Sequence, residues 1–107
     1  MAIYGYARVS REVQDLTRQL KALTSAGVEP QNIFKDIGSG KDFNRIEYQK
    51  LINQTLKAGD TLYITSIDRL GRDMKAIERE YQIITELRQC KLISIEEPFL
   101  SSTDNEV

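Results

Sequence analysis

Ser10 is the strongest candidate nucleophile in the sequence. It closes an apolar run, IYGYARVS, in which Arg8 stands two residues before it. The chain contains no histidine, so the imidazole base of a Ser-His-Asp triad is absent and another group must activate the serine. A serine after a strand is more often a helix cap, so Ser10 needs support from its surroundings.

Arginines lie at or after the ends of the first three expected strands. In open α/β sheets ligands bind at the carboxyl ends of the strands, so these side chains are expected at one edge of the sheet. Planar guanidinium groups match phosphate oxygens and keep their charge, so this edge is suited to a phosphodiester. The polar residues at or after the three strand ends are Arg8 and Ser10, then Asp36, Ser39 and Arg45, then Asp68, Arg69 and Arg72.

Each of these residues also has an ordinary structural interpretation. Arg69 and Arg72 are three apart and would share a solvated helical face. Asp68 could cap the helix that follows, and Asp36 could be a turn residue. The remaining candidates could be surface or sheet residues, namely Gln14 and Gln19 on the first helix and Tyr6 on the first strand.

Composition excludes several other kinds of chemistry. With no histidine and one cysteine, Cys90, a zinc site and an internal disulfide are not expected. The loop GSGK at residues 38–41 lacks the spacing of a phosphate-binding Walker motif. The net charge of -1 gives no global attraction to nucleic acid, so DNA binding would need the local arginine cluster or sequence outside this chain.

Hydrophobic spacing predicts four strands alternating with helices. The strands are expected at residues 3–9, 32–37, 61–64 and 91–95. This order predicts an α/β, three-layer domain with a central, mainly parallel sheet of four to five strands flanked by helices. The second helix has capping-box spacing at Asn44 and Glu47. Inward positions are predicted at Leu16, Leu20 and Leu23, at Tyr48, Leu51, Ile52, Thr55 and Leu56, and at Met74, Ile77, Tyr81, Ile84 and Leu87.

The C-terminal residues have the pattern of a helix start. Thr103 and Glu106 have capping-box spacing, and Val107 is the last residue. We therefore expect residues 1–100 to form one domain and residues 101–107 to begin a further helix. No apolar run approaches the ~20 residues of a membrane span, so we expect a cytoplasmic protein with no membrane partner.

Taken in order, the motifs resemble the catalytic domain of the serine site-specific recombinases, the resolvase/invertase family. The opening YARVS with Gln14 and Gln19, the middle residues Asp36, Ser39 and Arg45, and the later GD and IDRLGR motifs all follow that family's pattern. One departure is Ile46, which stands where the family usually has proline. Proline would favour the helix start there.

The resemblance implies a mechanism and a set of partners. Ser10 would attack DNA to give a 5′-phosphoserine linkage, without metal or cofactor, in a homodimer that becomes a homotetramer. A DNA-binding domain would lie outside this chain. The phosphate would be bound by Arg8, Arg45, Arg69 and Arg72, Asp68 would orient an arginine or handle the leaving-group proton, and Tyr6, Gln14, Gln19, Asp36 and Ser39 would support them.

Two other classes of function remain open from the residues. A receiver-like regulatory module would use Asp36 and Asp68 for phosphorylation or Mg²⁺. Such a module needs an acidic cluster at the first strand end, where this chain has Arg8 and Ser10. A metal-dependent nuclease would need several carboxylates around one ion, but Asp36, Asp60 and Asp68 are interleaved with arginines. The general base is not identified, although an arginine is a hypothesis despite its high intrinsic pKa.

Overall fold

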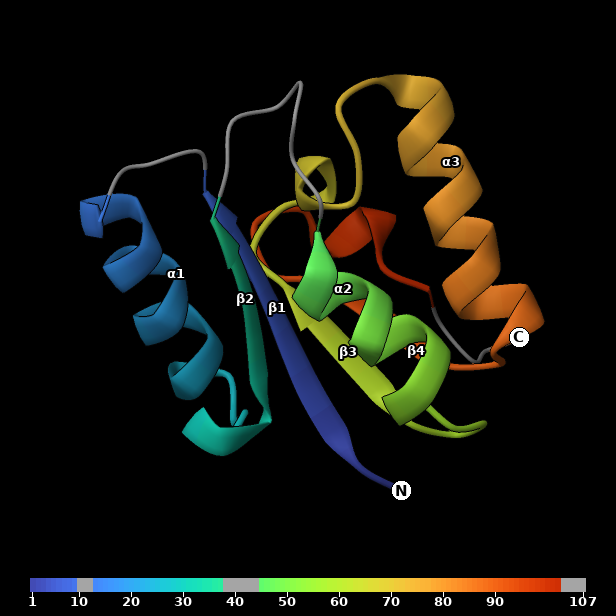
Figure 1. The fold of residues 1–107 in the computed structure, drawn as a ribbon, viewed down its shortest axis with the longest axis horizontal. Coiled ribbons are helices and arrows are strands. Elements are labelled where there is room, and N and C mark those ends of the chain that lie inside the picture. The colour runs from blue at the N-terminus through green and yellow to red at the C-terminus, as the bar shows by residue number, and fades with distance from the viewer. Residues whose placement is uncertain (10–12, 38–44, 103–107) are drawn as a thin grey trace.

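The computed structural model describes residues 1–9, 13–37 and 45–102, with the side chains of residues 13 and 14 left out. Its centre is a four-stranded sheet in the order β2-β1-β3-β4, in which every pairing is parallel (Figure 1). The strands are β1 (Ile3–Val9), β2 (Ile33–Ile37), β3 (Thr61–Ile64) and β4 (Lys91–Ser94), and the helices are α1 (Val13–Ser25), α2 (Ile46–Lys50) and α3 (Met74–Gln82). The predicted α/β class is confirmed.

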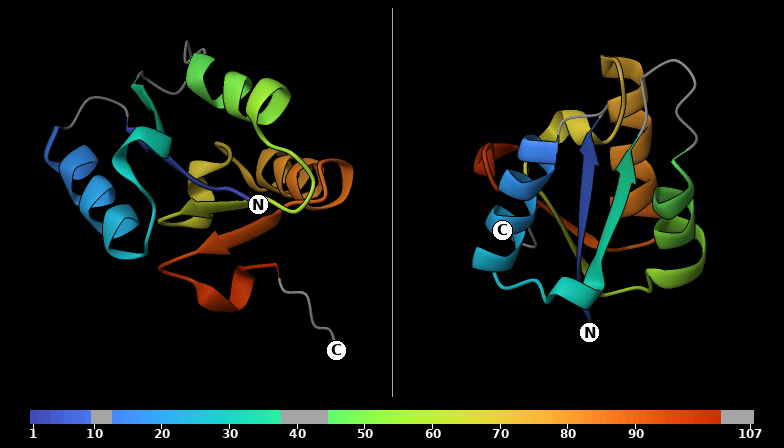
Figure 2. Two further views of the ribbon diagram at one scale, coloured as in Figure 1. Left: turned by 90° about the horizontal axis from the view of Figure 1, so that it is seen from below. Right: turned by 60° about the vertical axis from the view of Figure 1, so that its left-hand side comes forward.

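Helices cover both faces of the sheet. Helix α1 lies on one face, and α2 and α3 lie on the other (Figure 2). The α1 side buries a small core around Ala7, Leu23 and Val28. The opposite side holds the larger core, in which Tyr6 from β1 packs with residues of both helices. Successive strand residues point to opposite faces, so β1, one of the two inner strands of the sheet, contributes to both cores.

The two helices on the larger core do not keep a regular α-helical period. Each continues as a π-helical turn, over Leu51–Thr55 after α2 and over Ile83–Leu87 after α3. A π turn places an extra residue in the helix and so rotates the later side chains about the helix axis. Leu87 is therefore 70% exposed, and the prediction that it faces inward is wrong.

The prediction that Met74 faces inward is also wrong. This side chain is 65% exposed because Met74 is the first residue of α3 and lies beside Phe99, outside the packed core. In the first helix the hydrophobic spacing did not predict that Gln19 is buried, because this polar residue lies among inward-facing leucines. The structure buries Gln19 completely. Its burial is balanced by hydrogen bonds to the main chain of Arg8.

Helix α2 begins at Ile46, directly after Arg45, whose side chain makes no capping hydrogen bond. Asn44, one half of the predicted capping box, lies outside the described residues. Two N–H groups in the first turn of α2, those of Glu47 and Tyr48, donate to the two carboxylate oxygens of Asp36 at 3.0 and 2.9 Å. An N-terminus can be capped by any acceptor in reach, and here the acceptor comes from β2.

Candidate active site

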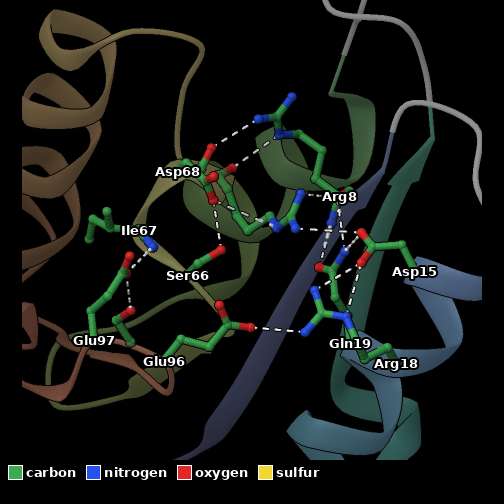
Figure 3. A network of polar contacts seen from close by, with 11 residues as sticks. Arg8, Asp15, Arg18, Gln19, Ser66, Ile67, Asp68, Glu96 and Glu97 are labelled. Atoms are coloured by element: carbon green, nitrogen blue, oxygen red, sulfur yellow. Dashed lines mark hydrogen bonds and ion pairs between the residues drawn. The ribbon is translucent and has the colours of Figure 1, made fainter.

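The carboxyl ends of β1, β2 and β3 lie at one edge of the sheet, where two arginines hold each other through their main chains. Arg8, near the end of β1, donates from Nη2 to the carbonyl oxygen of Asp68 at 2.9 Å and from Nε to that of Arg69 at 3.3 Å. Arg69 in turn donates from Nη1 to the carbonyl oxygen of Arg8 at 3.0 Å. Figure 3 shows Arg8 between the Asp68 loop and α1. The two guanidinium groups thereby link the end of β1 to the loop at residues 68–69.

A third arginine reaches the same loop from α2. Arg45 donates from Nη1 to the carbonyl oxygen of Leu70 at 2.7 Å, and its guanidinium carbon lies 3.9 Å from the centre of the Tyr48 ring. Arg8 and Arg45 thus converge on the backbone of residues 68–70, to which Arg69 itself belongs, and we call these three arginines the arginine cluster. Main-chain carbonyls carry no formal charge, so these hydrogen bonds position the guanidinium groups without neutralising them. Arg69 also lies 3.5 Å from a carboxylate oxygen of Asp15 and 3.8 Å from one of Asp68.

Electrostatics within the cluster favour an anionic ligand. Burial lowers the pKa of Arg8, and the positive charge of Arg45 lowers it further. A bound phosphate would oppose both effects, because an anion close to a cation stabilises the charged form. The cluster therefore has the charge and the donors of a phosphodiester site.

One carboxylate from α1 contacts the cluster at its border. Asp15 lies 3.5 Å from Nη2 of Arg69 and accepts stronger hydrogen bonds from Arg18 and from Gln19, at 2.8 and 2.9 Å. Burial raises the pKa of Asp15, but the hydrogen bonds from Arg18 and Gln19 outweigh it, so the pKa lies below its ordinary value. Sequence reasoning missed Asp15, although its i, i+4 spacing to Gln19 was a usable signal.

Gln19 fixes the main chain at Arg8. Its Oε1 accepts from the N–H of Arg8 at 3.3 Å, and its Nε2 donates to the carbonyl of Arg8 at 3.1 Å. The amide therefore clamps both polar groups of the residue whose side chain enters the cluster. Gln19 therefore acts on the guanidinium of Arg8 only indirectly, by fixing the main chain that carries it.

Asp36 connects β1, β2 and α2. Besides capping α2, its Oδ2 accepts a 2.8 Å hydrogen bond from the hydroxyl of Tyr6. Burial, followed by this hydrogen bond, raises the pKa of Tyr6, so the phenol stays protonated and remains a donor. The Tyr6 ring centre lies 5.8 Å from the Arg45 guanidinium carbon. Asp36 and Tyr6 therefore support the position of Arg45 through α2.

The loop after β3 differs from a simple helix start. Ile67–Arg69 forms a 3-10 turn, and α3 begins only at Met74 with Asp73 as its N-cap. Arg69 and Arg72 therefore do not share a helical face, and Asp68 does not cap α3. Burial separates the two arginines, because the Arg69 side chain is 19% exposed whereas Arg72 is an exposed residue.

Asp68 presents its carboxylate outward beside the cluster. The side chain is 67% exposed, and its Oδ1 accepts a 2.6 Å hydrogen bond from the hydroxyl of Ser66 and lies 3.8 Å from Nε of Arg69. The main-chain carbonyl of Asp68 accepts the hydrogen bond from Arg8, whereas its carboxylate lies near Arg69. The two parts of Asp68 therefore contact different arginines of the cluster.

Three predicted site positions cannot be placed. Ser10 and Ser39 lie outside the described residues, as does the side chain of Gln14. Val9, the last residue of β1, carries the chain toward Ser10 at the same edge as the arginine cluster. The site therefore consists, among the described residues, of the arginines and the groups that hold them.

The carboxylates considered for a metal nuclease are separated in the fold. Asp60 lies at the start of β3 and accepts from the N–H groups of Ala2 and Lys57, at the opposite edge of the sheet from Asp36 and Asp68. Within the parts of the chain that the structure describes, no three histidine, cysteine or acidic residues are grouped to hold a metal ion. Nor does any helix in those parts have the length and apolar character to cross a membrane.

The fold and the arginine cluster define a serine recombinase catalytic domain. Residues 3–107 match the family described as "Resolvase, N terminal domain", and the chain belongs to this family. The crystal structure of the N-terminal catalytic domain of TP901-1 integrase is similar, with a TM-score of 0.65 and 26% identity, over 92% of this chain and 79% of that one. The resemblance drawn from the motifs is confirmed.

Resolvases and a DNA invertase are among the relatives. Transposon Tn3 resolvase of Escherichia coli is 44% identical over 73 residues, covering 68% of this chain and 39% of that protein. The DNA-invertase of Enterobacteria phage P7 is also 44% identical over 73 residues, covering 68% and 38%. Transposon Tn917 resolvase of Enterococcus faecalis is 34% identical over 101 residues, covering 94% and 53%. The chain thus spans roughly half or less of the length of these relatives.

Proposed function

We propose that the protein carrying this domain performs site-specific recombination by cutting, exchanging and rejoining DNA strands through Ser10. The observation that carries the proposal is the arginine cluster. Three guanidinium groups meet on uncharged carbonyls at the sheet edge where β1 leads toward Ser10. Preorganised positive charge of this kind stabilises the charge that gathers on phosphate oxygens in a phosphoryl transition state.

The proposed reaction is a transesterification at phosphorus. The hydroxyl oxygen of Ser10 forms a bond to phosphorus, the bond from phosphorus to the 3′ oxygen breaks, and that oxygen leaves as a protonated 3′-hydroxyl. The product is a 5′-phosphoserine ester. One phosphoester replaces another, so rejoining by the reverse reaction needs neither a cofactor nor a metal.

The residues would divide this work by position. Arg8, Arg45 and Arg69 would bind the phosphate, and the exposed Arg72 would approach it from the rim. The outward carboxylate of Asp68 would orient an arginine or serve the leaving group.

The assembly is part of the proposal. Relatives include resolvases and a DNA invertase that are longer than this chain. We propose that the whole protein acts in the cytoplasm as a homodimer that pairs into a homotetramer on DNA, with site recognition outside residues 1–107. Gln14 and Ser39 would then support Ser10.

The test is covalent trapping with the full-length protein. The wild type and Ser10→Ala variants are incubated with a supercoiled plasmid carrying the DNA that flanks the gene, and the reaction is stopped with detergent. We expect a protease-sensitive protein–DNA adduct for the wild type and none for Ser10→Ala. The matched control is Ser25→Ala, an exposed serine at the end of α1, which should form the adduct normally.

Two results would overturn the proposal. An adduct formed by Ser10→Ala would remove Ser10 from the role of nucleophile. Loss of wild-type cleavage in excess EDTA would favour the metal-dependent nuclease instead.

A further inference from the structure

Tyr48 lies directly against one of the cluster's guanidinium groups. The Arg45 guanidinium carbon is 3.9 Å from the centre of the Tyr48 ring, and the side chain of Tyr48 is almost completely buried, at 1% exposed. A guanidinium group over an aromatic face is attracted by the ring, most strongly where both are shielded from water. The ring therefore forms a platform under Arg45.

The platform is fixed from three directions. The N–H of Tyr48 donates to Asp36 at 2.9 Å, and its hydroxyl donates to Oε1 of Glu80 on α3 at 2.7 Å. Its ring packs against that of Tyr6, with centres 5.0 Å apart and planes tilted by 58°. Burial, followed by the negative charge of Glu80, raises the pKa of Tyr48, so its hydroxyl stays a donor.

The main chain of Arg45 has a conformation that is unfavourable for a residue other than glycine. Its φ and ψ are 52° and 46°, in the left-handed region that residues with a side chain rarely adopt. Such a conformation persists where surrounding contacts determine it. Two of the contacts that hold the Arg45 side chain are those with the carbonyl of Leu70 and with the ring of Tyr48.

We infer that Tyr48 is a positioning residue that sets the guanidinium of Arg45 for the scissile phosphate, with Glu80 locking the ring to α3. The inference rests on the recombinase function proposed above and adds a residue to it. The aromatic face is the essential part, because leucine could fill the same core position without attracting a cation. The hydroxyl contributes by fixing the ring.

The experiment compares adduct formation by the full-length protein and its variants on the same plasmid. Tyr48→Leu should slow the adduct roughly 10- to 30-fold, the range expected for losing a buried cation–ring attraction. Tyr48→Phe keeps the ring and should slow it by no more than about threefold, from loss of one hydrogen bond. The matched control is Leu56→Ala. Leu56 belongs to the same hydrophobic core and follows the π-helical turn after α2, so this variant weakens the core but leaves the Tyr48 ring beside Arg45 in place.

Two further measurements separate positioning from general loss of structure. In an Arg45→Ala background, Tyr48→Leu should have little additional effect, because residues that act through one another are not additive. In NMR spectra of the 107-residue chain, Tyr48→Leu should reduce the ring-induced shift of the Arg45 side-chain protons to the smaller part that the more distant Tyr6 ring supplies, whereas Tyr48→Phe and Leu56→Ala should keep it.

The outcomes distinguish this inference from the proposed function. If the wild type forms the Ser10 adduct but Tyr48→Leu reacts as fast, or loses no more than Leu56→Ala, the role of Tyr48 is refuted and the recombinase function stands. Full additivity with Arg45→Ala would also refute it. If the wild type forms no adduct at all, the proposed function fails and the inference fails with it.

Discussion

Replacing Asp36 with alanine should destabilise the domain more than removing an ordinary helix cap. The carboxylate is 7% exposed and accepts three hydrogen bonds, from the hydroxyl of Tyr6 and from the N–H groups of Glu47 and Tyr48. Loss of a cap costs about 1 kcal/mol, and leaving a buried phenol unpaired costs roughly 1–3 kcal/mol. We therefore expect the free energy of unfolding to fall by about 3 kcal/mol.

Urea and thermal unfolding of the 107-residue chain measure this effect. For a domain near this size, about 3 kcal/mol corresponds to a fall in Tm of roughly 12–24 °C. Asp73→Ala is the matched control, because Asp73 caps α3 through a single 2.9 Å bond from the N–H of Ala76, and it should cost about 1 kcal/mol. Tyr6→Phe should cost about 1 kcal/mol alone, whereas in the Asp36→Ala background it should recover roughly 1–3 kcal/mol, because it removes the phenol that Asp36→Ala leaves unpaired.

The reasoning would be refuted if Asp36→Ala cost no more than Asp73→Ala. Full additivity between Asp36→Ala and Tyr6→Phe would likewise show that the two residues do not share a bond.

Two more predictions concern the borders of the site. Asp15→Asn should lower stability at neutral pH and not in acid: the pKa of Asp15 is lowered by folding, so its contribution is present above the ordinary value of 3.8 and disappears as pH falls through the lower folded value. Urea titrations at several pH values measure this difference, and a pH-independent difference would contradict it. Gly71→Ala should cost about 1–3 kcal/mol, because the added Cβ would lie 2.7 Å from the Cβ of Ala76 and 3.0 Å from backbone atoms of α3. A thermal melt unchanged from the wild type would show that the loop moves freely away from α3.

The sheet was predictable from local patterns, whereas details of the helices were not. Apolar runs with β-branched and aromatic residues located all four strands to within one residue, and their alternation with helices indicated parallel pairing. The outward positions of Met74 and Leu87 had no comparable signal. Leu87 depends on a π-helical turn and Met74 on where α3 begins, and both are set by tertiary packing.

The sequence indicated which arginines belong to the candidate site, but not which groups they contact. Strand ends placed Arg8 and Arg69 at one edge of a parallel sheet, and the structure brings their side chains together. Their acceptors are main-chain carbonyls, which every residue carries, so no residue type could reveal them. Tyr48 was predictable only as a core residue. The hydrophobic spacing indicated that its side chain is buried, but no sequence pattern indicated that its ring lies against the guanidinium of Arg45.

The contact between Asp36 and the start of α2 also joins the sheet to the site mechanically. The N–H of Glu47 donates to a carboxylate oxygen of Asp36, 11 residues earlier in the sequence. A buried acceptor of this kind holds the end of β2 and the start of α2 at a fixed separation. A displacement of β2 would therefore be transmitted to Arg45, the residue immediately before α2.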